Sequence, residues 1–373
     1  MLRVRDVLSL IDKLAPFHLA ESWDNVGLQT GDPAAPVRCM LVCLEITPAV
    51  VAEAHKLKAN LIIAHHPLIF KPLGSLAENS PQTKMLAELI RRRIAVIAAH
   101  TNLDRSPAGV NAALAKAVGL RNTEFLLPDA PEKLYKLAVF TPQGHEDAVI
   151  EALHQGGAGT IGNYDHCTFR ASGISTFRGN DAANPFLGQK GRLERAEEYR
   201  LETIVPQSRL ASSIQRMIQA HPYEEVAYDI YPLENLGAVR TGMGMIGELP
   251  RAIRLDTLIR NLKKIFKLKT IQWIGGDPGR SVRRIACLGG AVSSMIGALD
   301  RCEFDALIAG EINHHAAQEL LDRGRSAVIL GHFASECPVA AYLANMLQNR
   351  DEIGRSNVKV YVAKSEKAPL NIL

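Results

Sequence analysis

The stretch Leu61-Ile-Ile-Ala-His-His-Pro67 is a short apolar run that ends in two adjacent imidazoles. Its four apolar residues have the length of a strand buried on both faces, bounded by Asn60 and Pro67. In open α/β sheets, ligand sites collect beyond the carboxyl ends of the strands. Because neighbouring side chains of extended backbone point to opposite sides, His65 and His66 suit two metal ions better than one. A histidine pair alone is more often a hydrogen-bonded structural pair, so the metal hypothesis needs further residues.

The composition is that of an ordinary globular protein with two or three domains. The chain has 373 residues, 47% of them hydrophobic, and a net charge of +4. Its basic residues are dispersed, and the densest cluster, Arg91-Arg92-Arg93, fits a solvated last helical turn. This distribution argues against a nucleic-acid-binding surface.

Neither a membrane segment nor a disulfide framework is indicated by the sequence. No run reaches the roughly 18 apolar residues of a membrane span, and residues 1–6 lead into an amphipathic helix and not a signal peptide. None of the six cysteines forms a Cys-x-x-Cys pair, which argues against disulfides and against a thiolate zinc site. We therefore expect a cytoplasmic protein without membrane contact.

The first part of the chain alternates between predicted strands and helices. After an amphipathic helix over residues 1–14, each predicted strand is followed by a helix, and the last strand runs into His100-Thr-Asn-Leu-Asp104. The predicted strands are 39–46, 61–64 and 94–99, and the further helices are 48–58 and 83–93. Thr47 followed by Pro48 is typical of a helix start. The pattern predicts an α/β domain half over residues 1–127.

The middle of the chain has a different order of elements. From residue 136 the predicted order is β-α-β-β-α-β, which is typical of a ferredoxin-like split unit. Its strands are expected near 137–141, 168–177, 199–205 and 226–231, with helices over 145–155 and 208–220. We expect residues 128–245 to form an inserted ferredoxin-like α+β domain, with the glycine-containing segment 237–247 as the return linker.

The last part repeats the architecture of the first and forms a second α/β half over residues 246–373. Its predicted strands are 284–288, 304–309, 327–330 and 358–362, its helices are 295–301, 314–323 and 338–348, and Gly289-Gly290 is expected to be a turn. In each half the third strand runs into a histidine followed four residues later by a carboxylate: His100 with Asp104, and His332 with Glu336. The fold class is therefore α/β, with two pseudo-repeated halves and an inserted domain.

Metal-competent side chains thus follow three predicted strands. The set comprises His65, His66, His100, Asp104, His332 and Glu336. A histidine and a carboxylate four residues apart share one face if the segment turns helical after the strand. Imidazole and carboxylate donors without thiolate suit Zn, Fe, Mn, Ni or Co, and the ligand types do not decide between these elements.

Each of these residues also has a structural alternative. Asp104 could cap a following helix, and Glu336 could be a first-turn acid beside a helix dipole. His100 could orient a ligand or a substrate without binding metal. Glu311, at the end of the strand before His332, is a candidate general base, but an N-cap role or a supporting role is equally compatible with the sequence.

Several motifs together resemble the Nif-three-like dinuclear metal-centre family, also known as GTP cyclohydrolase I type 2 homologues. The matching motifs are Trp23-Asp-Asn-Val-Gly-Leu28, His65-His66-Pro67, His100-Thr-Asn-Leu-Asp104, Gly310-Glu311 and Gly331-His332-x-x-Ser335-Glu336. They cover residues 1–127 and 245–373. His221-Pro-Tyr-Glu-Glu225 also resembles the inserted PII- and CutA-like domain that some members carry.

The resemblance implies two divalent metal ions per chain. His66 and Asp104 would hold one ion, His65 and His332 the other, and Glu336 would bridge them, with His100 near the metals. It also implies a toroidal homohexamer with the metal sites facing its interior and the inserts near its openings.

Two hypotheses about function follow. The first is a metal-dependent hydrolase of a nucleotide-like or phosphorylated small molecule, since two divalent ions against two carboxylates favour an anionic substrate and an activated water. Its candidate catalytic residues are Glu311 and His100. The second is a non-enzymatic metal-handling or regulatory protein, because no P-loop or nucleotide fingerprint is present. Metal exchange and turnover discriminate between the two.

Overall fold

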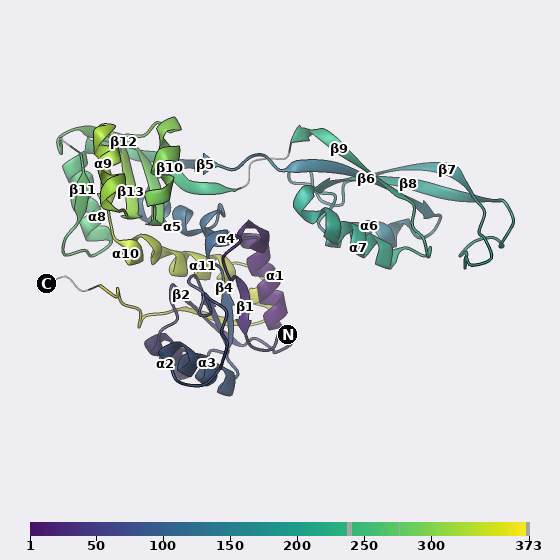
Figure 1. The fold of residues 1–373 in the computed structure, drawn as a ribbon, viewed down its shortest axis with the longest axis horizontal. Coiled ribbons are helices and arrows are strands. Elements are labelled where there is room, and N and C mark those ends of the chain that lie inside the picture. The colour runs from purple at the N-terminus through teal and green to yellow at the C-terminus, as the bar shows by residue number, and fades with distance from the viewer. Residues whose placement is uncertain (237–240, 276, 371–373) are drawn as a thin grey trace. The chain divides into compact units, whose positions relative to one another are not determined.

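The computed structural model describes residues 1–236, 241–275 and 277–370 (Figure 1). Contacts divide the chain into two compact units: the first unit comprises residues 1–129 and 240–373, and the second unit comprises residues 130–239. Among the described residues, no helix has both the length and the apolar character needed to cross a membrane.

The first sheet of the first unit is built around the stretch that carries His65 and His66. Its strand order is β1-β4-β3-β2-β15. The strands are β1 (Gly27–Thr30), β4 (Ala95–Ala98), β3 (Leu61–Ala64), β2 (Cys39–Cys43) and β15 (Lys359–Val362). Strands β4, β3, β2 and β15 are parallel, and only β1 is antiparallel to its neighbour. Every residue of β2, β3 and β4 is buried, as in a parallel sheet covered on both faces.

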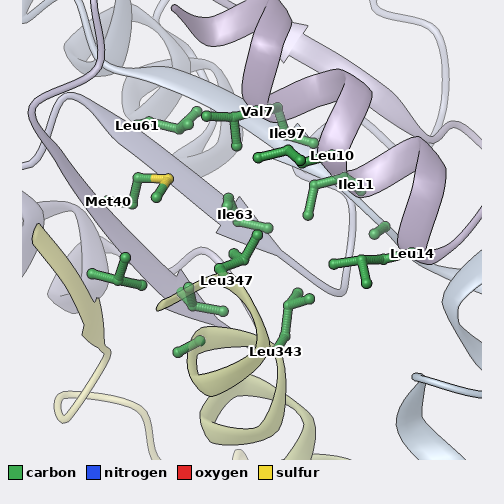
Figure 2. Close-up of a cluster of buried hydrophobic side chains, with 14 of the residues drawn as sticks. Val7, Leu10, Ile11, Leu14, Met40, Leu61, Ile63, Ile97, Leu343 and Leu347 are labelled. Carbon is green, nitrogen blue, oxygen red and sulfur yellow. The ribbon is translucent and has the colours of Figure 1, made fainter. Parts of the chain in front are cut away.

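Helices cover both faces of this sheet. Helices α1 (Val4–Leu14) and α11 (Pro338–Gln348) pack on one face, where Leu343 and Leu347 meet alternate strand residues such as Ile63 (Figure 2). Helices α2 (Pro48–Lys56) and α3 (Pro81–Arg91) cover the other face, which carries the intervening residues of the same strands. Helix α2 begins as predicted, because Thr47 Oγ1 accepts a hydrogen bond from Val50 N at 3.2 Å.

A second sheet lies in the same unit, with the strand order β11-β14-β13-β12-β10-β5. The strands are β11 (Gln272–Ile274), β14 (Ala327–Ile329), β13 (Ala306–Glu311), β12 (Ser281–Ala291), β10 (Gly242–Arg254) and β5 (Arg121–Pro128). Strands β14, β13 and β12 are parallel, while β11, β10 and β5 are antiparallel to their neighbours. In both sheets an antiparallel strand, β1 in one and β11 in the other, lies beside three consecutive parallel strands, β4-β3-β2 and β14-β13-β12. In the first sheet β15 adds a fourth parallel strand.

The second sheet is also covered on both faces. Helices α5 (Val110–Val118) and α8 (Leu255–Ile265) pack on one face. Helix α9 (His314–Asp322) and the 3₁₀ segment η3 (Ser293–Arg301) pack on the other. Four short helices complete the unit: η1 (Phe17–Leu19), α4 (Thr101–Asp104), α10 (His332–Glu336) and α12 (Asp351–Arg355).

The structure corrects several sequence predictions in this unit. Gly289 and Gly290 are not a turn between elements but part of β12, whose pairing register with β13 shifts between Leu288 and Ala291. Residues 242–247, expected to be linker, form the start of β10, and the predicted linker residues 237–240 lie outside the described residues. The helix expected over 295–301 is a 3₁₀ segment. Strand β15 pairs with β2, so the end of the chain returns to the first sheet.

The second unit has the element order β-α-β-β-α-β. Its strands β7, β8, β6 and β9 form an antiparallel sheet in that order. The elements are β6 (Lys133–Pro142), α6 (Glu146–Gln155), β7 (Thr168–Phe177), β8 (Glu194–Pro206), η2 (Gln207–Arg209), α7 (Leu210–Ala220) and β9 (Tyr228–Leu236). Both α helices lie on one face of the sheet (Figure 1). On that face Val149, Leu153 and Met217 meet Leu137 and Val205.

Candidate metal centre

The predicted site residues of the first unit come together from strand ends of both sheets. His65 and His66 follow β3, and His100 follows β4. Asp104 ends α4, and the single turn of helix α10 after β14 carries His332 and Glu336. Because the carboxyl ends of parallel strands share one edge of a sheet, each sheet brings its own residues together. A 3.1 Å contact between His66 Nε2 and Glu336 Oε2 then joins the residues of the two sheets.

His65 is the most deeply buried histidine of the group, with 2% of its surface exposed. Its Nδ1 lies 2.9 Å from the carbonyl oxygen of Ala99. Since a carbonyl only accepts, Nδ1 carries the proton and Nε2 keeps its lone pair. Burial lowers the pKa of His65 to about 3, so the ring is neutral at pH 7. The Nε2 atom lies 3.7 Å from Asp104 Oδ1, which leaves a neutral imidazole donor beside a carboxylate.

Glu336 occupies the centre of the group and is 4% exposed. Its Oε2 lies 3.1 Å from Nε2 of both His66 and His332. Within the described residues, this buried oxygen has no hydrogen-bond partner. Burial acts to raise the pKa of Glu336, but the imidazoles of His332 and His66 outweigh it and hold the pKa well below its usual value. A buried, ionised oxygen without a hydrogen bond is costly unless a cation balances it.

The groups around Glu336 have raised pKa values. Burial, together with the negative charge of Glu336, raises the pKa of Asp104 to about 7. Interaction with the carboxylate of Glu336 raises the pKa of His332 to about 9 against the effect of burial, and His332 Nδ1 also lies 3.2 Å from Glu311 Oε1. Without metal, protons and imidazolium thus balance the acidic groups. Divalent cations would compete with these protons for the same atoms.

His100 is held by a carboxylate that the sequence analysis did not single out. Its Nδ1 lies 2.9 Å from Oδ1 of Asp24, whose Oδ2 accepts a hydrogen bond from Thr101 N at 3.0 Å. Burial opposes ionisation of Asp24, but the hydrogen bonds with His100 and Thr101 lower its pKa to about 2. An ionised Asp24 keeps the proton of His100 on Nδ1 and leaves Nε2 free to bind a cation or accept a proton. The only signal for Asp24 was its place in the motif Trp23-Asp-Asn.

Two adjacent glycines make room for the Glu336 carboxylate. Gly290 has a φ of +68°, and a Cβ atom built on it would lie 2.4 Å from Glu336 Oε1. Its N–H donates to Ser335 Oγ at 3.1 Å, and Ser335 Oγ in turn donates to the carbonyl of His332 at 2.8 Å. Gly290, which lies at the shift in strand register, therefore helps to position α10 through its hydrogen bond to Ser335. The sequence alone predicts an ordinary turn at this glycine pair.

Asn111 connects the two carboxylate-bearing segments. Its Nδ2 donates to the carbonyl of Asp104 at 3.0 Å, and its Oδ1 accepts from Gly289 N at 2.9 Å. Asn111 is 3% exposed and lies in helix α5. The side chain thus ties the end of α4, which follows the first sheet, to the bulged end of β12 in the second.

The donor set fits divalent metal ions. Two groups of three residues place one ligand atom each within 4.8 Å of the others: His65, His66 and His100 in one, and His66, His332 and Glu336 in the other. His66 belongs to both groups. Imidazole nitrogens with carboxylate oxygens suit Zn, Fe, Mn, Ni and Co. The buried oxygen of Glu336 that lacks a hydrogen bond supplies the independent observation that a cation belongs there.

The structure excludes the alternatives considered for the two carboxylates, a helix cap for Asp104 and a first-turn acid for Glu336. Asp104 does not cap α5, whose N-cap is Gly109. Glu336 ends α10, and α11 begins after it at Pro338. Glu311 lies at the end of β13, is exposed, and faces His332. Its role as an N-cap is excluded too, because Asn313 caps α9 by accepting a hydrogen bond from Ala316 N.

Comparisons with known proteins cover the chain from end to end. A family model described as Duf34/NIF3 (NGG1p interacting factor 3) matches residues 2–369. A GTP cyclohydrolase 1 type 2 homolog of Halalkalibacterium halodurans is 39% identical over 326 residues, 87% of each chain. The Bacillus subtilis protein of that name is 35% identical over 372 residues, 99% of this chain and 98% of the relative. The crystal structure of a Bacillus cereus protein related to NIF3 aligns with a TM-score of 0.81 and 37% identity, covering 100% of this chain and 99% of that one.

Proposed function

The chain belongs to the Duf34/NIF3 family, and we propose that its first unit holds two divalent metal ions and hydrolyses a nucleotide-like or phosphorylated small molecule. One observation carries this proposal. Oε2 of Glu336 is buried and ionised, lacks a hydrogen bond among the described residues, and lies 3.1 Å from an imidazole nitrogen on either side. A carboxylate in that position is suited to share its charge between two cations.

The resemblance of the sequence motifs assigns the donors to two sets around Glu336. His66 and Asp104 would hold one ion, and His65 and His332 the other, while Glu336 would contact both. The contacts in the structure pair them differently, because His65 Nε2 lies 3.7 Å from Asp104 Oδ1 and His66 groups with His332 and Glu336. His65 is ready to donate from Nε2, because its Nδ1 proton is engaged by Ala99. A pair of divalent ions supplies charge for an anionic substrate and lowers the pKa of a shared water.

Two side chains around the donors are candidates to accept a proton, and the charge of the site favours an anionic substrate. His100, fixed by ionised Asp24, presents Nε2 toward the donor group and is a candidate to accept a proton. Glu311 is exposed, lies 3.2 Å from His332 and is the second candidate for a general base. With only two carboxylates among the proposed ligands, two divalent ions leave net positive charge, which favours a phosphate or another anionic group in the substrate.

The second unit and the assembly complete the proposal. We propose that residues 130–239 are an inserted ferredoxin-like domain, supported by the order β-α-β-β-α-β and the antiparallel sheet order β7-β8-β6-β9. The matching order of three parallel strands in both sheets of the first unit supports two pseudo-repeated halves. We also propose a toroidal homohexamer, on the resemblance of the sequence motifs, and a cytoplasmic location, on the composition of the sequence. Size-exclusion chromatography with light scattering tests the assembly.

The test begins with metal analysis of protein purified without chelator. The metal-loaded protein is then assayed against phosphoesters, nucleotides including GTP, and cyclic amides. GTP is included because the similar bacterial proteins carry the name GTP cyclohydrolase 1 type 2 homolog. Turnover that requires metal and falls in Asp24→Asn would support the proposal. Metal bound at two sites and exchanged readily, with no turnover of any compound, would overturn the hydrolase and favour a metal-handling protein.

A further inference from the structure

A second cluster of metal-ligating side chains lies in the second unit, apart from the residues discussed above. His154 lies in helix α6, and Asp165 and His166 lie in the segment between α6 and β7. One ligand atom from each of the three falls within 4.8 Å of the others. The imidazoles of His154 and His166 stack with their centroids 3.6 Å apart. Sequence analysis singled out none of these residues.

Carboxylates surround His166 on two sides. Its Nδ1 lies 3.0 Å from Asp165 Oδ1, and its Nε2 lies 3.3 Å from Glu151 Oε2. Glu151 and His154 are three residues apart in α6, a spacing that places both on one face of the helix. Gln155 donates to the other oxygen of Glu151 at 2.8 Å, which orients that carboxylate. The cluster therefore contains two imidazoles and two carboxylates on adjoining segments.

A nitrogen of His154 without a hydrogen-bond partner is independent support for a bound ion at the cluster. Its Nδ1 is shielded from solvent and has no hydrogen-bond partner among the described residues. A buried polar atom normally has such a partner, because an unmade hydrogen bond costs free energy. One ring nitrogen of His154 lies within 4.8 Å of the ligand atoms of Asp165 and His166, so a cation held by the cluster would lie close to this ring. A metal ion would satisfy the lone pair of this nitrogen.

The backbone holds Asp165 and His166 near α6. Cys167 N donates to the carbonyl of Gly159 at 2.8 Å, and Gly159 N donates to Ile204 of β8 at 2.9 Å. The carbonyl of Cys167 accepts a hydrogen bond from Thr203 Oγ1 at 2.9 Å. The segment is thus anchored to the sheet immediately after His166, while the side chains of Asp165 and His166 remain exposed and free to adjust.

We propose that His154, Asp165 and His166 form a mononuclear site for a zinc-type divalent ion, with Glu151 orienting His166 through the opposite ring nitrogen. Donors held about 2.0–2.2 Å from one ion at tetrahedral angles lie roughly 3.3 Å apart. The stacked imidazoles of His154 and His166 would have to rotate apart for both rings to direct a nitrogen at one ion. Mixed imidazole and carboxylate ligands favour Zn²⁺, Co²⁺ or Ni²⁺ over Ca²⁺ and Mg²⁺, which prefer oxygen ligands alone.

Bound metal would cross-link α6 to the segment that leads into β7. The cross-link would stabilise the second unit, because an ion that binds only the folded state shifts the unfolding equilibrium. The site is independent of the metal centre of the first unit, since the two share no residue. It therefore stands even if the first unit proves to hold no metal.

The test counts Zn²⁺ ions bound per full-length chain by equilibrium dialysis and elemental analysis. His166→Asn removes a donor, and Asn tolerates the left-handed backbone of this residue, whose φ is +51°. His166→Asn and Asp165→Asn should each bind one Zn²⁺ fewer than the parent. Asp147→Asn, an exposed change on the same helix outside the cluster, is the matched control and should bind as many ions as the parent.

A variant of the first unit separates the two sites. Glu336→Gln should lose metal from the first unit and still lose one further ion when His166→Asn is added. Equal Zn²⁺ content and affinity in the parent, His166→Asn and Asp165→Asn would overturn the proposal. Displacement of the additional ion by Ca²⁺ at comparable concentration would overturn it as well, because the site would then lack the ligand preference argued here.

Discussion

Replacing Gly290 by alanine tests whether the bulge in β12 shapes the metal centre. The new Cβ would lie 2.4 Å from Glu336 Oε1, about 1 Å inside the ordinary contact distance, taking favourable carbon contacts as roughly 3.5 Å. The residue also has a φ of +68°, where a side chain costs about 1–2 kcal/mol. The carboxylate must therefore move, the backbone must rearrange, or both.

Such a movement is large on the scale of metal coordination, in which ligand distances are held within about 0.2 Å. We expect Gly290→Ala to weaken metal binding in the first unit by about 10- to 100-fold, the range found when residues that support metal ligands are changed. The assay is competition with a chromophoric chelator, combined with urea unfolding of the metal-free protein. The second measurement separates the backbone cost from the loss of metal.

Gly297→Ala is the matched control. Gly297 lies in the 3₁₀ segment η3 of the same unit, and a Cβ atom built there meets nothing within 4 Å. Its metal affinity should equal that of the parent. If Gly290→Ala binds metal in the first unit as tightly as Gly297→Ala does, Glu336 is not held against β12, and Gly290 does not make room for its carboxylate.

Three further predictions concern the ligands, the core and the second unit. Glu336→Gln should lose at least one metal ion of the first unit because it removes the charge shared by both, whereas Asp104→Asn should weaken only one; elemental analysis showing the reverse would make Asp104 the bridging ligand. Leu347→Ala, in the fully buried core of the first sheet, should lower the free energy of unfolding by about 2–5 kcal/mol in urea titrations, and a change below the lower limit would contradict the packing described. Replacing residues 130–239 with a short linker should leave a folded, metal-binding first unit, because Asp129 N already donates to the carbonyl of Thr241 at 3.0 Å. Excision of 128–245 instead should destabilise the first unit, since it removes Gly242, Met243 and Met245 from the pairing of β10 with β5, and circular dichroism with thermal unfolding distinguishes the two.

The buried parallel strands could be predicted from sequence because their signal is local. Strand β3 occupies residues 61–64 as expected, since a short apolar run between Asn60 and the histidines has few alternatives. Helix α11 likewise matches its predicted range, with Pro338 at its start. The histidines and carboxylates were identified because they follow such strands, and their convergence depends on the common edge of a parallel sheet.

Features that depend on tertiary contacts could not be predicted from the sequence. The glycines at 242, 244 and 247 predict a linker over the start of β10, yet pairing with β5 and β12 makes it a strand. A Cβ at Gly242 or Gly247 would clash with β5, so these glycines serve close strand packing. Asp24 and Asn111 act through hydrogen bonds to residues distant in sequence, a relation that no local pattern encodes. Strand β15 gives no sign in sequence of which sheet it joins.

The central claim is that five side chains from two sheets hold two metal ions, and anomalous diffraction from crystals of the metal-loaded protein tests it most directly. Data collected on either side of the absorption edge of the metal should show two peaks in the first unit, about 3.5–4 Å apart. Glu336 should lie between the peaks, with His66 and Asp104 beside one and His65 and His332 beside the other. A single peak in this group of residues, or two peaks of which neither contacts Glu336, would contradict the account.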